Sequence, residues 1–196
     1  MDLGYNFFKI DYKNIKPEKG KILIAEPFLN DSYFKRSIVF LTEHNEDGTV
    51  GFVLNKPVNI NLEEVVSELQ SFQTQVSIGG PVGTNSLHYI HTLGDIIPES
   101  IHIIDNIYWG GDFEIIKKIL NSTKIKQNQI KFFLGYSGWQ PEQLTDELKE
   151  NSWIVSQLDP DIIMQPDTHN LWKKTISRLG KKYEIWSNFP EDPGLN

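Results

Sequence analysis

Two β-prone runs on either side of a short turn limit this chain to folds that contain an antiparallel hairpin. Residues 37–44 and 49–54 are rich in β-branched and aromatic side chains. Between them, residues 45–48 read Asn-Glu-Asp-Gly, and the final glycine suits a position that needs positive φ. The pattern predicts a β-hairpin over residues 37–54.

The rest of the chain alternates short strand patterns with short helix patterns. Amphipathic spacing and capping residues predict helices over 61–69, 112–120, 141–148 and 171–179. Apolar runs predict strands over 21–25, 76–78, 87–93, 101–104, 130–134 and 152–155. Strict βαβ alternation is missing and the clearest strand pair is antiparallel, so the order of elements favours an α+β fold with a mixed sheet.

The length of 196 residues, without a repeat or a flexible linker, is that of one domain. We expect this domain to occupy residues 20–187, between an N-terminal extension (1–19) and a C-terminal tail (188–196) that has no periodicity. The chain contains no cysteine, which excludes thiol catalysis, disulfides and thiolate zinc sites.

The net charge of −7, from 19 basic and 26 acidic residues, argues against the concentrated basic face that direct nucleic-acid binding needs. It argues equally against binding to anionic membranes. No apolar run is long enough to span a bilayer, and residues 1–17 contain no apolar core of a signal peptide. The cytoplasm is therefore the expected compartment.

Four motifs follow one another between residue 20 and about residue 180. They are 20–27 (GKILIAEP) with Leu29, Asp31 and Phe34; 43–45 (EHN) with Gly48, Gly51 and 54–57 (LNKP); 79–82 (GGPV) with Leu87 and His91; and 135–139 (GYSGW) with Gln143, Leu144, Glu147 and Trp153. No single motif is specific, but the ordered set resembles the YqgE/AlgH family of bacterial proteins.

This resemblance implies a largely antiparallel sheet that curls into a pseudo-barrel with peripheral helices. It implies no established activity and no cofactor. The AlgH label links the family to transcriptional regulation of alginate synthesis, but the sequence contains no helix-turn-helix pattern or basic recognition helix. Lys56 stands where the family more often has arginine, which would weaken a bidentate contact with an anion.

Ser137 is a candidate nucleophile because Gly-Tyr-Ser-Gly follows a predicted buried strand and precedes a predicted helix. The nucleophile elbow of hydrolases needs G-x-S-x-G, however, and Trp139 occupies the place of the last glycine. A tight turn built from small residues explains the same letters without catalysis. A hydrolase that uses Ser137 with His44 or His91 as the base remains the alternative to a binding protein.

Glu43, His44 and His91 are the candidates for a general base or a metal site. Zinc needs three protein ligands, and adjacent residues of a strand point to opposite faces, so Glu43 and His44 cannot share one site. We therefore expect no metal, and we weigh turn-fixing roles for these side chains against a shared binding cleft.

The leading hypothesis is a non-enzymatic binding or regulatory module, such as a transcription-linked regulator that acts through a protein partner. Its recognition face would combine three separate bends, at 55–57, 79–81 and 135–139, because loops with exposed polar and aromatic residues often carry function. The partner would be a protein or a small molecule that the sequence does not identify. The candidate contact residues are Glu43, His44, Asn55, Lys56, Gly79, Gly80, Pro81, His91, Tyr136, Ser137 and Trp139.

Overall fold

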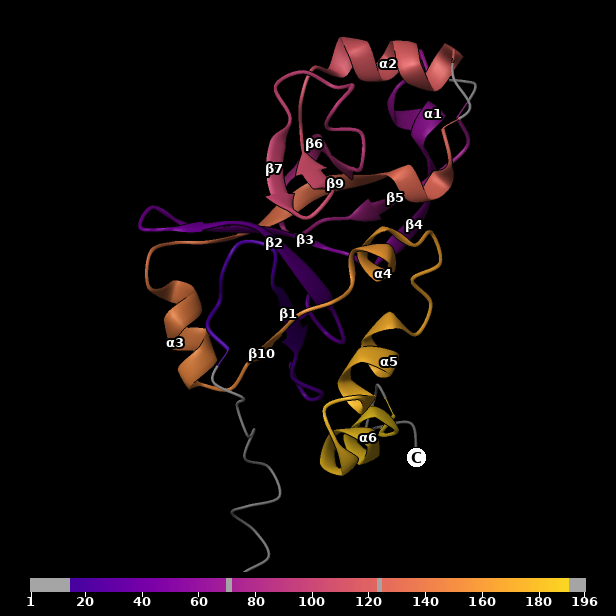
Figure 1. The fold of residues 1–196 in the computed structure, drawn as a ribbon. Helices are drawn as coiled ribbons and strands as arrows, with labels where there is room; N and C mark the ends of the chain where they lie inside the picture. The colour runs from indigo at the N-terminus through magenta and orange to yellow at the C-terminus, as the bar shows by residue number, and fades with distance from the viewer. Residues whose placement is uncertain (1–14, 70–71, 123–124, 191–196) are drawn as a thin grey trace, which may run out of the picture.

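The computed structural model describes residues 15–69, 72–122 and 125–190. Within these ranges the chain forms a ten-stranded, mostly antiparallel sheet with helices around it (Figure 1). The strands are β1 (Ile22–Ala25), β2 (Ile38–Asn45), β3 (Gly48–Val53), β4 (Pro57–Asn61), β5 (Gln75–Ile78), β6 (Val82–His91), β7 (Ile101–Ile104), β8 (Ile107–Trp109), β9 (Ile130–Trp139) and β10 (Trp153–Ser156).

The helices are α1 (Leu62–Val65), α2 (Phe113–Ser122), α3 (Gln143–Lys149), α4 (Pro160–Met164), α5 (Leu171–Ser177) and α6 (Lys181–Ser187), with a 3-10 turn at Gln127–Gln129. The α+β class and the mixed sheet are confirmed. The sheet runs in the order β10-β1-β2-β3-β9-β6-β8-β7 and is not closed, so it is a pseudo-barrel only in a loose sense. No helix in the described ranges is long and apolar enough to cross a membrane.

The predicted hairpin is formed by β2 and β3, which pair antiparallel from Val39 opposite Val53 to Asn45 opposite Gly48. Gly48 has a φ of 135°, and a Cβ there would lie less than 3.0 Å from the backbone oxygen of Trp139. The glycine is therefore required both by the turn and by the close approach of β9.

Strand β9 corrects the sequence-based prediction of a strand over 130–134 that ends in a turn. It continues for ten residues, to Trp139. Its first half pairs with β6 and β5, and its second half pairs with β3, with Gly51 opposite Ser137. Segment 135–139 is thus a central strand that joins the two halves of the sheet, and it is not a loop.

Other differences from the predicted elements lie at the margins. Helix α1 is a single turn although a helix over 61–69 was expected, and α3 begins two residues after Pro141. The sequence patterns did not reveal β4, β8, α4 or α6, which are all shorter than eight residues. Short elements carry too few periodic positions to stand out from irregular chain.

Each group of helices covers its own part of the core. Figure 1 shows α1 and α2 at the top of the view, α3 at the left and α4–α6 at the lower right. On β1, Ile22 and Ile24 pack in the cluster under α4–α6, whereas Leu23 and Ala25 pack in the cluster that contains Leu144 of α3. Strand β1 is therefore buried on both faces, which explains why its sequence is continuously apolar.

Candidate ligand-binding site

The candidate residues around Gly79 form a packing junction inside the sheet. The hydroxyl of Ser137 is fully buried and donates a hydrogen bond of 2.9 Å to the carbonyl oxygen of Gly79. The same oxygen accepts a bond from the amide of Val53. Gly80 is also buried, and Pro81 is exposed. This arrangement fixes the β5–β6 connection against β9 and β3.

His91 is a structural residue of the core. Its ring is fully buried, Nε2 donates to the carbonyl oxygen of Gly110 at 2.8 Å, and Nδ1 accepts from the amide of Leu93 at 3.1 Å. Both nitrogens are used in the neutral tautomer. Burial lowers the pKa of His91, and the bond to Gly110 offsets only part of that effect.

We expect the free energy of unfolding to decrease as the pH falls below 6.5. Burial lowers the pKa of both His91 and His88 from the ordinary value of 6.5. As the pH falls, the histidines of the unfolded chain bind protons before those of the folded chain. Their contribution to stability is therefore fully present above pH 6.5 and is lost as the pH falls towards the lower pKa values of the folded state. Each histidine contributes a slope of at most about 1.4 kcal/mol per pH unit.

Urea unfolding over a pH series measures this slope. His91→Gln should reduce it, whereas His169→Gln, which changes an exposed ring, should leave it unchanged. Equal slopes for the wild type and His91→Gln would show that His91 does not couple protonation to folding.

The tip of the β2–β3 hairpin carries a second group of candidates. Glu43, Tyr136 and Trp139 line one hollow of about 330 Å³. His44 lines a different hollow of about 310 Å³, and its Nδ1 lies 2.7 Å from the hydroxyl of Thr49. Glu43 and His44 therefore serve separate hollows, as the strand alternation predicts. No cluster of metal-binding side chains exists among the described residues.

Trp139 lines its hollow mainly as a core residue, with 5% of its surface exposed. Its indole nitrogen donates to Oε2 of Glu147 at 2.8 Å, and the indole nitrogen of Trp153 donates to the same oxygen at 2.7 Å. Phe34 stacks on the Trp139 ring. Trp139, one of the candidate contact residues, is therefore held in place by core packing where it lines the hollow.

Asn55 also has a structural role. Its side-chain oxygen accepts from the amide of Ile38 at 2.8 Å, and its side-chain nitrogen donates to the carbonyl oxygen of Arg36 at 2.8 Å. These two bonds hold the start of β2 against the end of β3. Lys56 differs because it lines a large hollow on the surface.

Two adjoining hollows, which we call the polar groove, lie where β4, β5 and β9 meet the segment between α4 and α5. Their volumes are about 290 Å³ and about 490 Å³. The first contains Lys131 and the second contains Lys56. They share Pro57, Gln75, Pro166 and Thr168, so the two hollows border each other along these residues.

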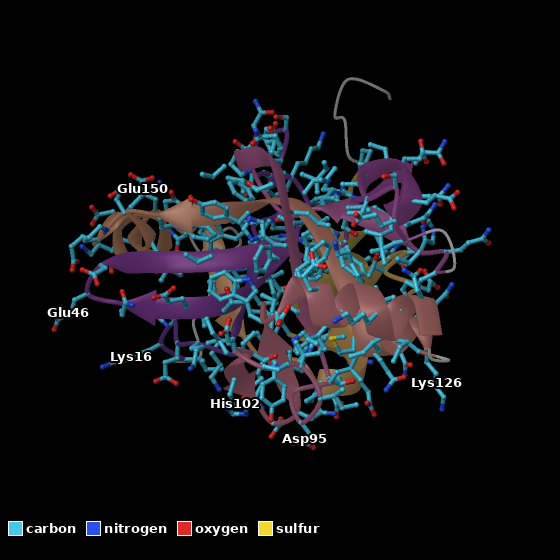
Figure 2. All side chains as sticks on the ribbon, turned by 90° about the horizontal axis from the view of Figure 1, so that it is seen from above. Lys16, Glu46, Asp95, His102, Lys126 and Glu150 are labelled. Carbon is cyan, nitrogen blue, oxygen red and sulfur yellow. The ribbon has the colours of Figure 1, made fainter. Side chains whose placement is uncertain are left out.

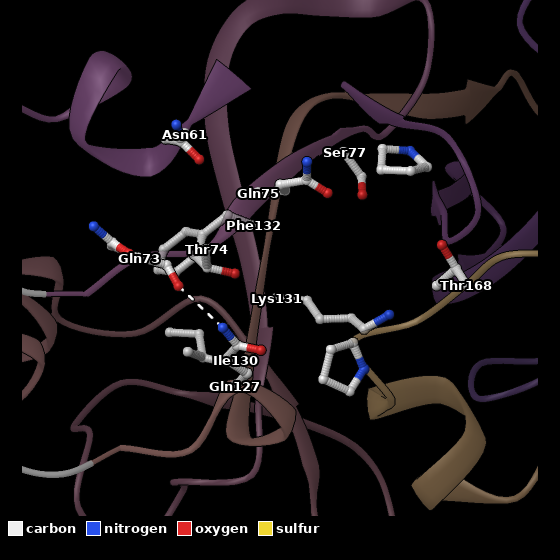
Figure 3. A pocket seen from close by; sticks show the side chains of 12 residues that line it. Asn61, Gln73, Thr74, Gln75, Ser77, Gln127, Ile130, Lys131, Phe132 and Thr168 are labelled. Atoms are coloured by element: carbon white, nitrogen blue, oxygen red, sulfur yellow. Dashed lines mark hydrogen bonds between the residues drawn. The ribbon is translucent and has the colours of Figure 1, made fainter. Parts of the chain in front are cut away.

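Lys131 provides the most unusual electrostatic feature of the groove. In Figure 3 its side chain extends along the hollow towards the side on which Thr168 lies, with Gln75 and Ser77 across from it. Lys131 is partly buried, and its side-chain amine makes no hydrogen bond or ion pair with any other described residue. Burial lowers the pKa of its amine to about 8.

Comparison with known proteins assigns the chain to a family. A profile of AlgH-like proteins matches residues 22–184. The chain belongs to the AlgH-like family. A UPF0301 protein from Bacteroides fragilis is 45% identical in an alignment that covers 100% of both chains, and one from Cytophaga hutchinsonii is 40% identical over 91% of this chain and 98% of its own.

Two solved structures share the AlgH-like fold. A Corynebacterium diphtheriae protein superposes with a TM-score of 0.75, at 20% identity, over 96% of this chain and 100% of its own. The AlgH protein from Pseudomonas aeruginosa gives a TM-score of 0.67, at 27% identity, over 90% of this chain and 98% of its own. The resemblance that the four sequence motifs indicated is thereby confirmed.

The candidate residues of this AlgH-like chain line more than one hollow. Glu43, Tyr136 and Trp139 line the hollow beside the β2–β3 hairpin, whereas Asn55 and Lys56 line the second hollow of the polar groove. Glu46, at the tip of the hairpin, and Lys126, next to the groove residue Gln127, lie at opposite sides of the view in Figure 2. The three predicted bends do meet, since the amide of Ile78 donates to Lys56 O and Ser137 bonds Gly79. They meet as packed backbone within the sheet, and the recognition face that they were expected to form stays a prediction.

Sequence reasoning did not single out Lys131. The one available signal was a charged residue within the apolar run Ile-Lys-Phe-Phe-Leu of residues 130–134. A lysine in a predicted buried strand is a polar group that needs a partner, because burial of an unpaired charge is unfavourable. In this AlgH-like fold, the groove gives that side chain open space in place of a protein partner.

Proposed function

We propose that this protein is a non-catalytic binding module that holds a polar, anionic small ligand in the polar groove. The observation that carries the proposal is Lys131, a partly buried cation that faces the groove without a partner among the described residues. A buried charge is retained at a cost in stability. A ligand anion would supply the missing counter-charge.

The lining of the groove supports a polar ligand. Apart from Lys131 and the apolar residues Pro57, Ile130, Phe132 and Pro166, the described lining of the first hollow presents amides and hydroxyls, and it includes no carboxylate. The hydrogen-bonding side chains are Asn61, Gln73, Thr74, Gln75, Ser77, Gln127 and Thr168. Such groups both donate and accept hydrogen bonds, so they suit the hydroxyl, amide or ring nitrogen atoms of a polar metabolite.

A hydrolase that uses Ser137 has less support. The Ser137 hydroxyl is fully buried and donates to a backbone carbonyl, and neither His44 nor His91 is its hydrogen-bond partner. A nucleophilic serine needs a base within hydrogen-bond reach and an accessible hydroxyl. His44 instead contacts Thr49, and His91 bonds Gly110.

A role as a regulator is compatible with ligand binding. The recessed groove favours a small-molecule partner over a protein partner, because protein partners commonly use broader, flatter surfaces. A regulator of this kind would respond to the ligand and pass the signal to a further protein. The acidic composition continues to argue against direct reading of DNA.

Lys131→Met should abolish anion binding and at the same time stabilise the protein. The low pKa of about 8 means that protonated Lys131 destabilises the folded state near neutral pH. Removal of the charge should raise the free energy of unfolding at neutral pH by about 2 kcal/mol, after a discount for partial exposure. The gain should shrink as the pH rises from about 8 towards the ordinary value of 10.5.

Titration with inorganic phosphate, followed by amide chemical shifts, tests the binding half of this prediction. In the wild type the shifts should cluster around β5, the start of β9 and residues 166–168. Lys126→Met is the matched control, because Lys126 is exposed and does not line the groove. If Lys131→Met and wild type respond to phosphate alike, the groove is not the site.

A further inference from the structure

The polar groove is cationic at both ends. Lys131 stands in the first hollow, and Arg36, Lys56 and Lys173 line the second. Among the described residues that line either hollow, one carries a carboxylate, Asp167. The Asp167 carboxylate accepts a hydrogen bond of 2.8 Å from the amide of His169, so it is engaged in a local turn.

This concentration of positive charge contrasts with the whole chain. The protein carries a net charge of −7, whereas the groove lining has four cationic side chains and one anionic side chain. Local surplus of one sign in a recessed surface raises the concentration of counter-ions there. The excess of positive charge in the groove, compared with the whole chain, therefore points to an anionic ligand with more than one charged group.

The pairing of β4, β5 and β9 gives the distance between Lys131 and Lys56, which lie at the two ends of the groove. Ser77 of β5 lies opposite Phe133 of β9 and opposite Pro57 of β4. Lys131 precedes Phe133 by two residues in the parallel partner, and Lys56 precedes Pro57 by one in the antiparallel partner. With strands about 4.8 Å apart and a rise of about 3.3 Å per residue, the two lysine Cα atoms are about 14 Å apart.

The Arg36 end is ordered by packing. Its guanidinium lies 5.0 Å from the centre of the Trp172 ring and donates to the carbonyl oxygen of Phe189. Arg36 therefore supplies a fixed positive field, while the flexible, single-ended amines of Lys56 and Lys173 are better suited to follow a ligand group. We assign the contact at this end to Lys56 and Lys173.

We propose that the groove binds a ligand with two anionic groups, one held by Lys131 and the other by Lys56 and Lys173, with a polar body across the residues that the two hollows share. This inference rests on the proposed function, since it names the chemical class of the groove's ligand. Two tethered anions bind cooperatively because the second contact forms within the same complex. A linker that is too short or too long loses this advantage.

A length series of linear dicarboxylates, from succinate to sebacate, tests the proposal. Each is compared with the monocarboxylate of equal chain length, and dissociation constants come from amide chemical-shift titration of the full-length protein. We expect one intermediate length to bind at least about tenfold more tightly than its monocarboxylate. A flat series, in which dicarboxylates and monocarboxylates bind equally, would overturn the two-anion inference.

Variants separate this inference from the proposed function. Lys56→Met should bring the affinity ratio of the best dicarboxylate to its monocarboxylate close to one, and Lys131→Met should remove the binding of both. Lys126→Met should retain the wild-type ratio, because its side chain lies outside the groove. A flat series with binding that still depends on Lys131 contradicts only the two-anion inference. Carboxylate and phosphate binding that is insensitive to Lys131→Met contradicts both proposals.

Discussion

Replacing Gly80 with alanine should lower the free energy of unfolding by about 4 kcal/mol or more, which is a large share of the roughly 5–15 kcal/mol of an ordinary domain. Gly80 has a φ of 155°, which side-chain-bearing residues rarely adopt. A Cβ at this position would lie less than 3.0 Å from both Tyr136 O and Ser137 N. These atoms belong to the backbone of β9, which cannot move without breaking its pairing with β3 and β6.

Gly110→Ala is the matched control for the steric part of this effect. Gly110 also has a positive φ, of 70°, but a Cβ there would meet no atom within 4 Å. Gly110→Ala should therefore lower the free energy of unfolding by only about 1 kcal/mol, from backbone strain. Urea unfolding followed by tryptophan fluorescence measures both variants. Similar losses for the two would mean that φ alone, and not the contact with β9, accounts for the glycine.

Replacing Glu147 with alanine should destabilise the protein by about 3 kcal/mol. Oε2 of Glu147 accepts hydrogen bonds from the indole nitrogens of Trp139 and Trp153, which are 5% and 1% exposed. The substitution leaves two buried donors without an acceptor, and each unpaired donor costs about 1–3 kcal/mol. The end of β9, β10 and α3 should loosen together, since all three contribute to this contact.

Two further variants define the origin of that loss. Gln143→Ala removes a neighbouring bond of 2.9 Å to the other Glu147 oxygen at an exposed residue, and should change stability by less than about 0.5 kcal/mol. Glu147→Gln keeps one acceptor oxygen and should lie between the wild type and the alanine variant. If Glu147→Ala unfolds at the same urea concentration as wild type, the two indoles find other partners.

The parts of the fold that the sequence predicted are those whose signals are local. The β2–β3 hairpin combines two β-prone runs with a turn that ends in Gly48, and α2 begins where Asp112 accepts bonds from the amides of Glu114 and Ile115. Each feature is specified within one continuous stretch of the sequence, and the longer of the two is the hairpin over residues 37–54. Long-range packing is not needed to specify them.

The predicted end of β9 was wrong because a glycine in a strand pattern has two structural explanations, a turn or the close approach of a neighbouring strand. Gly135 and Gly138 suggested a turn, but a Cβ on Gly135 would lie less than 3.0 Å from the backbone oxygens of Val82 and Gly80. The glycine permits a neighbouring strand to approach closely, which a single sequence does not distinguish from a bend. The same ambiguity made Ser137 look accessible when it is buried.

The sequence did not reveal the candidate site for a related reason, since most of its residues are far apart along the chain. Apart from its near neighbours Gln127, Ile130 and Phe132, the surroundings of Lys131 come from β4, residues 73–77 and residues 166–168, which are separated from it by more than thirty positions in the sequence. Polar residues such as Gln75 and Thr168 carry no pattern that marks them as groove lining. The family resemblance identified the fold, whereas only the assembled sheet identified where a ligand would fit.

The late position of β9 along the chain has a consequence for biosynthesis. The free edge of β3 leaves the ribosome well before Trp139, and at ordinary translation rates the wait is on the order of 10 s. During that time an apolar hairpin exposes an edge able to pair with another nascent chain. Chaperone dependence of newly made protein should therefore concentrate in the interval before residue 139 emerges.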